Sequence, residues 1–437
     1  MIAKIEIDGY RLLDGIKVDL RQLNVVIGAN AVGKSTLLDC LQCISQCVEH
    51  PLNTALGWHW GLASLLNVAA SDKQLGWKVT VEKPPFVPWS QLPLEEGRPL
   101  VYEVVLRGDQ LGQVSAKYEV LRKPDPDHGY SEPYKLLEAT PFRRMIQDRK
   151  SHHFVPFDEA LPHPTSPAVP ETFGGTANEP ASSSSSLPPA AQEAALLLSQ
   201  IRFINEFPAP SAIRLLLANM TFYPGFDVSR FSNLRTKASE IRPPSFLSVN
   251  GDNLGTVLHE ILTRYDFKTA ADELRQFLGA AYASFEEIHC DTAFGTPPQV
   301  VVRLREKGMS RSMELWELSD GMLRFLCLAT ALLNPTVSPF VAIDEPEVGL
   351  HPRLLPIVGD MIKTAAERTQ VLVTTHSPDL LSRFAIEDVA VMARVADAPR
   401  AAWLRPADRK TLVQMVKTVS GENLGELQRS GELEAIG

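Results

Sequence analysis

The sequence predicts an α/β fold in which buried parallel strands alternate with helices. Short apolar runs occur at residues 23–27, 339–343 and 370–375, as in strands that are buried on both faces of a sheet. Helical patterns at residues 34–50 and 350–368 follow the first two runs. Alternation of apolar strands and helices is typical of a parallel sheet with helices packed against it.

Other segments predict antiparallel strands. Residues 16–20, "IKVDL", alternate apolar and polar side chains, as a half-exposed strand does. Further strands are expected in "GWKVTVE", "LVYEVVLRG" and "VSAKYEVLRK", and another in residues 298–306. From residue 191 helical patterns dominate, including "AAQEAALLLSQIRFINEF" and "NLGTVLHEILTRY".

The chain changes character near residue 124. Residues 156–190 are rich in proline and contain the serine run Ser182–Ser186, which predicts a loop or disordered insertion without a core. Residues 141–154 are locally basic, which fits either a solvated face or contacts to phosphate groups. Four segments are expected: 1–124 and 311–437 as two halves of one domain, 125–195 as the insertion, and 196–310 as a helical lid with connecting strands.

Composition narrows the classes of function. The 437 residues carry a net charge of −9, which argues against a broadly basic surface for nucleic acid. A local basic patch is still compatible with this charge. The first residues lack the apolar stretch of a signal peptide, and no apolar run approaches the length that spans a bilayer. A cytoplasmic location is the expectation.

Three of the five cysteines form a pattern with a histidine, namely Cys40, Cys43, Cys47 and His50. A zinc site is one interpretation. On one helix, however, Cys40 and His50 lie about 15 Å apart along the axis, whereas ligands of one zinc ion lie within about 5 Å of each other. The spacing favours a helical stripe that faces the core.

Residues 28–36, "GANAVGKST", match the phosphate-binding pattern G-x-x-x-x-G-K-[ST]. The match lies between a buried strand and a helix, where backbone N–H groups form a cradle for anions. Gly28 and Gly33 permit the turn, Lys34 is expected to neutralise the β- and γ-phosphates, and Ser35 is expected to bind Mg²⁺. Asn30 and Thr36 of the same match are also expected to bind the nucleotide.

Two further strands end in polar residues that suit the same chemistry. Asp344 and Glu345 follow one strand, and strand ends in parallel sheets face the ligand crevice. Asp344 is expected to hold Mg²⁺ and Glu345 to act as general base for a water molecule. His376 follows the next strand and is expected to donate a hydrogen bond to the γ-phosphate.

Taken in order, "GANAVGKST", "ELSDGMLRF", "AIDEPEVGLHP" and "VLVTTHSP" resemble the motifs of SMC-like, ABC-type ATPases. The chain is most similar to the compact ATPases grouped with OLD and RecF-like proteins, over residues 1–75 and 196–437. The resemblance implies an ABC-type ATPase head: a mixed sheet with a parallel core and helices on both faces, an antiparallel β subdomain and a helical lid. It implies ATP and Mg²⁺ as cofactors.

The resemblance also implies residue roles. Ser319 and Gly321 occupy the signature loop, which in the family contacts the γ-phosphate bound by the opposite subunit. Asp320 replaces the glycine of the wider family, and a carboxylate is unfavourable beside a triphosphate unless it points away or meets a cation. Glu347 and His351 are expected at the dimer interface, and Arg11 near the nucleotide.

The resulting functional hypothesis is an ATPase that forms a head-to-head homodimer around two ATP molecules. Its hydrolysis cycle would regulate an effector protein, a nuclease or toxin encoded nearby, in bacterial anti-phage defence. A RecF-like DNA repair or replication ATPase that binds DNA directly is the first alternative, with RNA as a further candidate partner. A scaffold that binds ATP, hydrolyses it slowly and sequesters a toxin or nuclease is the second. No membrane contact is expected.

Overall fold

The computed structural model describes most of the chain. The described residues are 1–67, 73–82, 99–109, 112–123, 134–148, 153–160, 195–236, 239–240, 246–293, 298–336, 338–394 and 401–403. The expected proline- and serine-rich insertion lies largely outside the described residues, apart from a part within 134–160.

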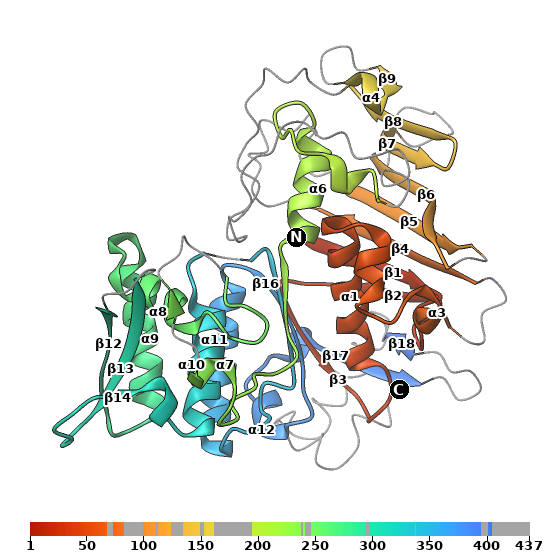
Figure 1. Cartoon of the computed structure of the whole chain (residues 1–437). Coiled ribbons are helices and arrows are strands. Elements are labelled where there is room, and N and C mark those ends of the chain that lie inside the picture. The colour runs from red at the N-terminus through yellow and green to blue at the C-terminus, as the bar shows by residue number, and fades with distance from the viewer. Residues whose placement is uncertain are drawn as a thin grey trace.

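A six-stranded sheet forms the centre of the molecule (Figure 1). Its first five strands pair in parallel and its last pairs antiparallel. The expected α/β core with parallel strands is therefore confirmed. In order across the sheet, the strands are β10 (Met220–Tyr223), β15 (Phe340–Asp344), β16 (Gln370–Thr374), β3 (Leu23–Ile27), β17 (Val389–Arg394) and β18 (Ala401–Trp403).

The central strands are buried on both faces, as their apolar composition predicts. Every residue of β3 is buried, and its side chains alternate between two cores. Val26 packs into one core, whereas Val25 and Ile27 pack into the other. This alternation follows from the two-residue period of a strand, and it places the sheet between two layers of packed elements.

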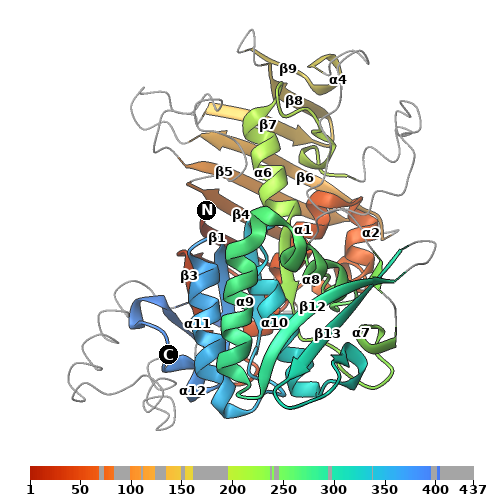
Figure 2. The same cartoon turned by 90° about the vertical axis from the view of Figure 1, so that its left-hand side faces the viewer.

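An antiparallel sheet covers one face of the central sheet, with helices between them (Figure 2). Residues of α1 (Lys34–Glu49) and α6 (Pro208–Ala218) fill the shared core. The strands in order are β2 (Ile16–Asp19), β1 (Ile2–Asp8), β4 (Gln74–Val81), β5 (Leu100–Gly108), β6 (Val114–Lys123), β7 (Tyr134–Thr140), β8 (Arg143–Gln147) and β9 (Phe154–Pro156).

Helices and a small sheet cover the other face. The helices are α8 (Leu254–Thr263), α9 (Lys268–Ala281), α10 (Asp320–Leu333) and α11 (Leu355–Ala366). The small antiparallel sheet comprises β11 (Ser239–Glu240), β12 (Phe285–Ala293), β13 (Gln299–Glu306) and β14 (Met313–Glu314). The remaining short helices are α2 (Leu52–Gly57), α3 (Leu62–Leu65), α4 (Phe157–Ala160), α7 (Asn233–Thr236) and α12 (Pro378–Leu381), with 3₁₀ turns at Leu198–Gln200, Tyr265–Phe267, Leu315–Glu317, Pro352–Leu354 and Ile386–Asp388.

Two segments differ from the sequence-based expectation. Strands β7 to β9 continue the antiparallel sheet, although no strands are predicted there. The helix expected over residues 190–207 is wrong for residues 195–207, which contain one 3₁₀ turn. The reason is a buried carboxylate: Glu119 accepts hydrogen bonds from the N–H groups of Leu197 and Leu198, at 2.6 and 2.9 Å, and so fixes the returning chain against β6.

The cysteine stripe of α1 faces the core. Cys40, Cys43 and Cys47 are buried among apolar side chains, and burial raises the pKa of Cys40 well above its usual value. Their contacts are therefore those of core residues, as the spacing along the helix predicts. Among the described residues, no helix is both long and apolar enough to cross a membrane.

Candidate nucleotide site

The glycine-rich loop joins β3 to α1 in a conformation that requires its glycines. Gly28 has φ 151° and Gly33 has φ 111°, both in the region that L side chains rarely adopt. A Cβ atom on Gly28 would lie 2.2 Å from the carbonyl oxygen of Met392 on β17. The loop therefore passes close to the neighbouring strand, and any side chain at residue 28 would displace it.

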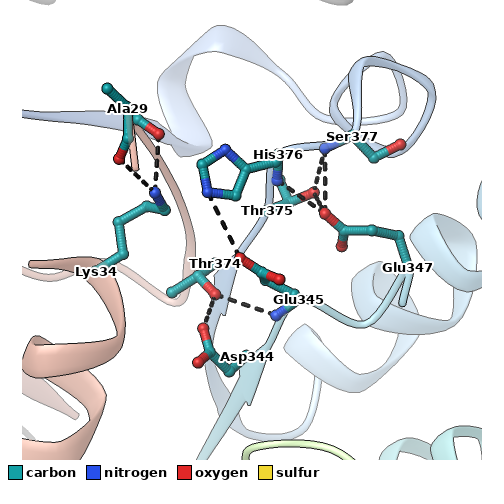
Figure 3. A network of polar contacts seen from close by, with 10 residues as sticks. Ala29, Lys34, Asp344, Glu345, Glu347, Thr374, Thr375, His376 and Ser377 are labelled. Carbon is teal, nitrogen blue, oxygen red and sulfur yellow. Dashed lines mark hydrogen bonds and ion pairs between the residues drawn. The ribbon is translucent and has the colours of Figure 1, made fainter. Parts of the chain in front are cut away.

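Lys34 is the first residue of α1, and its ammonium group lies over the loop. The Nζ atom donates to the carbonyl oxygens of Gly28 and Ala29, at 2.8 and 2.9 Å, and the residue is 5% exposed. Figure 3 shows the side chain folded back onto the loop. Near it, Asn30 and Ser35 are exposed and Thr36 is half-buried, so these polar groups face the side from which a ligand enters.

One row of paired residues connects the three strand ends. Val26 on β3 pairs with Thr374 on β16, which pairs with Asp344 on β15. Neighbouring strands lie about 4.8 Å apart, so Asp344 lies roughly 10 Å from the strand that carries the phosphate loop. The buried Thr374 hydroxyl donates a short hydrogen bond to Oδ1 of Asp344 and accepts one of 3.1 Å from the N–H of Glu345. It thereby fixes both acidic residues.

Glu345 and His376 face each other at this edge (Figure 3). The Nε2 atom of His376 lies 3.5 Å from Oε1 of Glu345, and both side chains are about one third exposed, at 32% and 38%. Glu345 has φ 46°, an uncommon value for a residue with a side chain. Backbone strain of this kind occurs where the surrounding structure holds a functional group in place.

The site contains oxygen donors that fit Mg²⁺. This ion prefers carboxylate, hydroxyl, phosphate and water oxygens and keeps several of its waters. The Ser35 hydroxyl is exposed in the first turn of α1, and the Asp344 carboxylate lies at the end of β15 in the same edge of the sheet. Among the described residues no cluster of three His, Cys, Asp or Glu side chains suits a metal.

The signature residues lie at the start of α10. Ser319 caps the helix, because its Oγ accepts a 3.3 Å hydrogen bond from the N–H of Met322. Gly321 lies beside the loop that follows β15, since a Cβ at this position would lie 3.6 Å from the carbonyl oxygen of Gly349. Asp320 meets a cation: Nη2 of Arg235 lies 2.7 Å from its Oδ1. The charge of Asp320 is thus offset within the chain.

Arg11 lies beside α1, where its guanidinium is held by Asp39. The Nη1 atom is 2.6 Å from Oδ2 of Asp39, which also accepts from the hydroxyl of Tyr10 at 2.7 Å. Oδ1 of Asp39 lies 3.2 Å from Nδ1 of the buried His59. Burial alone would raise the pKa of Asp39, but hydrogen bonds from His59 and Tyr10 and the charge of Arg11 lower it below its usual value. Arg11 is therefore placed one to two turns from Lys34.

A cavity of about 330 Å³ opens beside the acidic strand end. Its lining includes Asp344, Glu345 and Arg324 of α10. The loop after β10 contributes Pro224, Gly225, Phe226 and Asp227. The cavity therefore joins the acidic residues to the signature helix.

Most of the expected site residues converge. Gly28 to Thr36, Asp344, Glu345 and His376 share the carboxyl edge of the central sheet. Ser319 and Gly321 lie at the start of α10, where Gly321 is beside Gly349, and Arg11 contacts α1 at Asp39. Two supporting residues, Thr374 and Arg235, have no assigned role in the sequence-based prediction, and a third, Glu347, is expected only as an interface residue. The polar end of β16 is a sequence signal for Thr374. No local pattern points to Arg235, because it lies 85 residues from Asp320.

Two family models match the chain. Residues 164–382, half of the chain, match the family described as "AAA domain, putative AbiEii toxin, Type IV TA system". Residues 1–79 match the family described as "AAA ATPase domain". Among individual proteins, the DNA repair protein RecN of Rickettsia bellii is 32% identical over 89 residues, which are 20% of this chain and 14% of RecN. The match thus spans a small part of that relative.

Solved structures of similar fold are heads of Smc proteins. A Smc head bound to the C-winged helix domain of ScpA has a TM-score of 0.50 at 11% identity, covering 92% of this chain and 97% of that one. The Pyrococcus furiosus Smc head with an extended coiled coil, bound to the C-terminal domain of ScpA, has a TM-score of 0.51 at 9% identity, covering 95% and 99%. The chain belongs to the AAA-domain family matched by residues 164–382, and its fold resembles that of Smc heads.

Proposed function

We propose that the chain hydrolyses ATP with Mg²⁺ at the carboxyl edge of the central sheet. The observation that supports this most directly is the row Val26–Thr374–Asp344, which aligns the phosphate loop with Asp344 and its neighbour Glu345. Strand ends that share one edge of a parallel sheet form the usual ligand crevice of such folds. Bound Mg²⁺ would neutralise charge on the phosphates.

Three polar residues of the site act directly on the phosphates or the attacking water in this proposal. Lys34 exchanges the carbonyl oxygens of Gly28 and Ala29 for β- and γ-phosphate oxygens. Glu345 accepts the proton of a water molecule through a carboxylate oxygen while the water oxygen attacks the γ-phosphorus. The bond from that phosphorus to the bridging oxygen breaks, which releases ADP and phosphate. Nε2 of His376 donates to a γ-phosphate oxygen.

We also propose that two copies enclose two ATP molecules head to head. Ser319 and Gly321 would then contact the γ-phosphate held by the other copy, because exposed groups at a helix N-terminus suit an anion. Exposed apolar side chains on this part of the chain support a contact surface, since Trp316 is 59% and Val348 53% exposed. The dimer would form when ATP is bound and separate after hydrolysis.

Two variants test the proposal. Lys34→Ala should abolish phosphate release, whereas Glu345→Gln should bind ATP, release phosphate at least about 100-fold more slowly, and accumulate a dimer in analytical ultracentrifugation. Lys363→Ala on α11 is the matched control and should behave as wild type. Turnover that survives Lys34→Ala would refute ATP hydrolysis at this site, and a monomeric Glu345→Gln protein in ATP would refute the dimer.

For the biological role we propose regulation of an effector protein, a nuclease or toxin encoded nearby, in anti-phage defence in the bacterial cytoplasm. The description of the matched family, "AAA domain, putative AbiEii toxin, Type IV TA system", supports this setting. Co-purification of the chain with the product of an adjacent gene, in a complex that changes with ATP, would test it. A neighbouring gene product that never binds would oppose it.

Direct DNA binding in repair is the second candidate function. The 32% identity to the DNA repair protein RecN over 89 residues favours it. In that case duplex DNA should stimulate phosphate release, and the affinity should fall steeply with salt as counterions are released. An ATPase rate that is independent of DNA would leave effector regulation as the better proposal.

A further inference from the structure

The glutamate three residues after Asp344 turns inward. The family resemblance implies that Glu347 lies at a dimer interface, and within one copy its carboxylate contacts the turn that carries His376. Oε1 accepts three hydrogen bonds: from the Thr375 hydroxyl at 2.7 Å, from the N–H of His376 at 2.8 Å and from the N–H of Ser377 at 3.1 Å. Figure 3 shows these three contacts converging on one oxygen atom.

These contacts fix the backbone of His376 directly. Successive N–H groups that point at one place form a concave site for an anion, and hydrogen bonds to an ionised acceptor are stronger than those between neutral groups. The second carboxylate oxygen of Glu347, Oε2, is buried and has no hydrogen-bond partner among the residues that the structure describes. Burying such an atom is unfavourable, so the arrangement persists because the contacts at Oε1 compensate for it.

The loop that carries Glu347 also reaches the other parts of the proposed site. The N–H of Val348 donates to the carbonyl oxygen of Glu345 at 3.0 Å. Gly349, at φ 75°, packs against the guanidinium of Arg324, which lies 2.8 Å from the place where a Cβ would stand. One short loop therefore contacts the general base, the histidine turn and the signature helix.

We infer that Glu347 is a positioning residue that holds His376 where it would reach the γ-phosphate, and that it links His376 to the loop 346–350. This inference rests on the proposed ATP hydrolysis. Val348 and Gly349 are exposed, so a second copy that packs on the loop would shift Glu347, and with it the backbone of His376. Glu347 itself does not touch the reacting atoms, because its bonded oxygen is saturated by the turn.

A double-mutant cycle tests the inference, since it separates action through His376 from a general structural role. Glu347→Gln keeps the shape but removes the charge, and should lower kcat by about 10- to 100-fold, the scale of an orienting hydrogen bond to a charged group. The apparent KM for ATP should change by less than about threefold. In the His376→Ala background, Glu347→Gln should lower kcat by no more than about twofold.

Controls distinguish the possible failures. Glu367→Gln, the same change at an exposed residue after α11, should match wild type in kcat, and thermal melting should show that all variants fold. Effects of Glu347→Gln and His376→Ala that multiply would overturn the inference, as would an unchanged kcat in Glu347→Gln. Either result leaves ATP hydrolysis intact provided that Lys34→Ala still abolishes turnover, so the two failures are distinguishable.

Discussion

Arg235 and Asp320 form an ion pair across 85 residues of sequence, with Nη2 of the arginine 2.7 Å from Oδ1 of the aspartate. The arginine side chain is 8% exposed and the aspartate 72% exposed, so the cation is fixed and the carboxylate lies over it. The same guanidinium donates to the carbonyl oxygens of Val228, Trp316 and Leu318. Arg235 therefore both offsets the charge of the signature loop and holds the backbone that leads into Ser319.

This pair predicts unequal effects of its two members. Arg235→Gln should weaken ATP-dependent dimerisation by roughly 10-fold or more, because it removes charge-assisted hydrogen bonds of about 1.5–3 kcal/mol and leaves a carboxylate beside the phosphate site. Asp320→Asn should change the dimer dissociation constant by less than about threefold, since one exposed ion pair contributes little. Analytical ultracentrifugation in ATP measures both, and Arg275→Gln on α9 is the control. A double variant that is no better than Arg235→Gln would exclude charge repulsion as the cause.

Substitution of Gly28 in the phosphate loop and of Gly57 in α2 should have different effects on stability. Gly28→Ala should destabilise the protein by about 2–4 kcal/mol, because its Cβ would overlap the Met392 carbonyl at 2.2 Å and its φ is unfavourable. Gly57→Ala in α2 meets no atom within 4 Å and should be neutral or stabilising by up to about 1 kcal/mol. Urea denaturation of the two variants is the measurement, and equal midpoints would contradict the prediction.

Removal of the Thr374 hydroxyl should reduce ATPase activity without loss of nucleotide binding. Thr374→Val removes the hydroxyl that orients Asp344 and the N–H of Glu345, so kcat should fall about tenfold or more, which corresponds to ~1.4 kcal/mol. Thr221→Val on the edge strand β10 is a matched control, because its hydroxyl makes a 3.5 Å contact with the Phe340 carbonyl. Rates of phosphate release at saturating ATP compare them. A Thr374→Val enzyme as fast as the control would show that the hydroxyl is dispensable.

The buried Glu119 should make the protein less stable as pH rises. Its burial raises the pKa above the usual 4.5, although Leu197, Leu198 and Tyr102 donate hydrogen bonds to it. Because the folded state binds its proton more tightly, the free energy of unfolding should fall as pH rises from about 4.5 through the folded-state pKa.

Comparison with Glu119→Gln isolates this effect. The glutamine variant should be less stable, since its amide group meets backbone donors, and its stability deficit should shrink as pH rises because only the wild type loses stability. Urea midpoints between pH 4 and 8 measure the difference. A deficit that grows with pH would reverse the sign and show that the folded state favours the ionised carboxylate.

The sequence predicted the parts of the fold that local chemistry determines. The apolar run of β3, the glycines after it and the amphipathic helix α1 are each specified by neighbouring residues, and so are the strands before Asp344 and His376. The same strand ends placed the acidic residues and the histidine at one edge, because parallel strands share a direction.

Contacts between distant residues were not predictable in this way. Nothing near Glu119 indicates that it captures Leu197 and Leu198, and this capture overrides the helical pattern of that segment. Likewise, Glu347 and Arg235 act through partners that lie 28 to 85 residues away. Such pairs depend on tertiary packing, which a local pattern does not encode.

The folded-back side chain of Lys34 has a consequence for ligand selectivity. Its ammonium group already has two oxygen partners in the loop, so an entering anion competes with them and gains only the difference in interaction energy. A ligand with a single phosphate gains little by this exchange, whereas a triphosphate offers charged oxygens of several phosphates at once. The loop thus discriminates by the number of phosphates, and AMP and inorganic phosphate should be poor competitors even at concentrations at which ATP saturates the site.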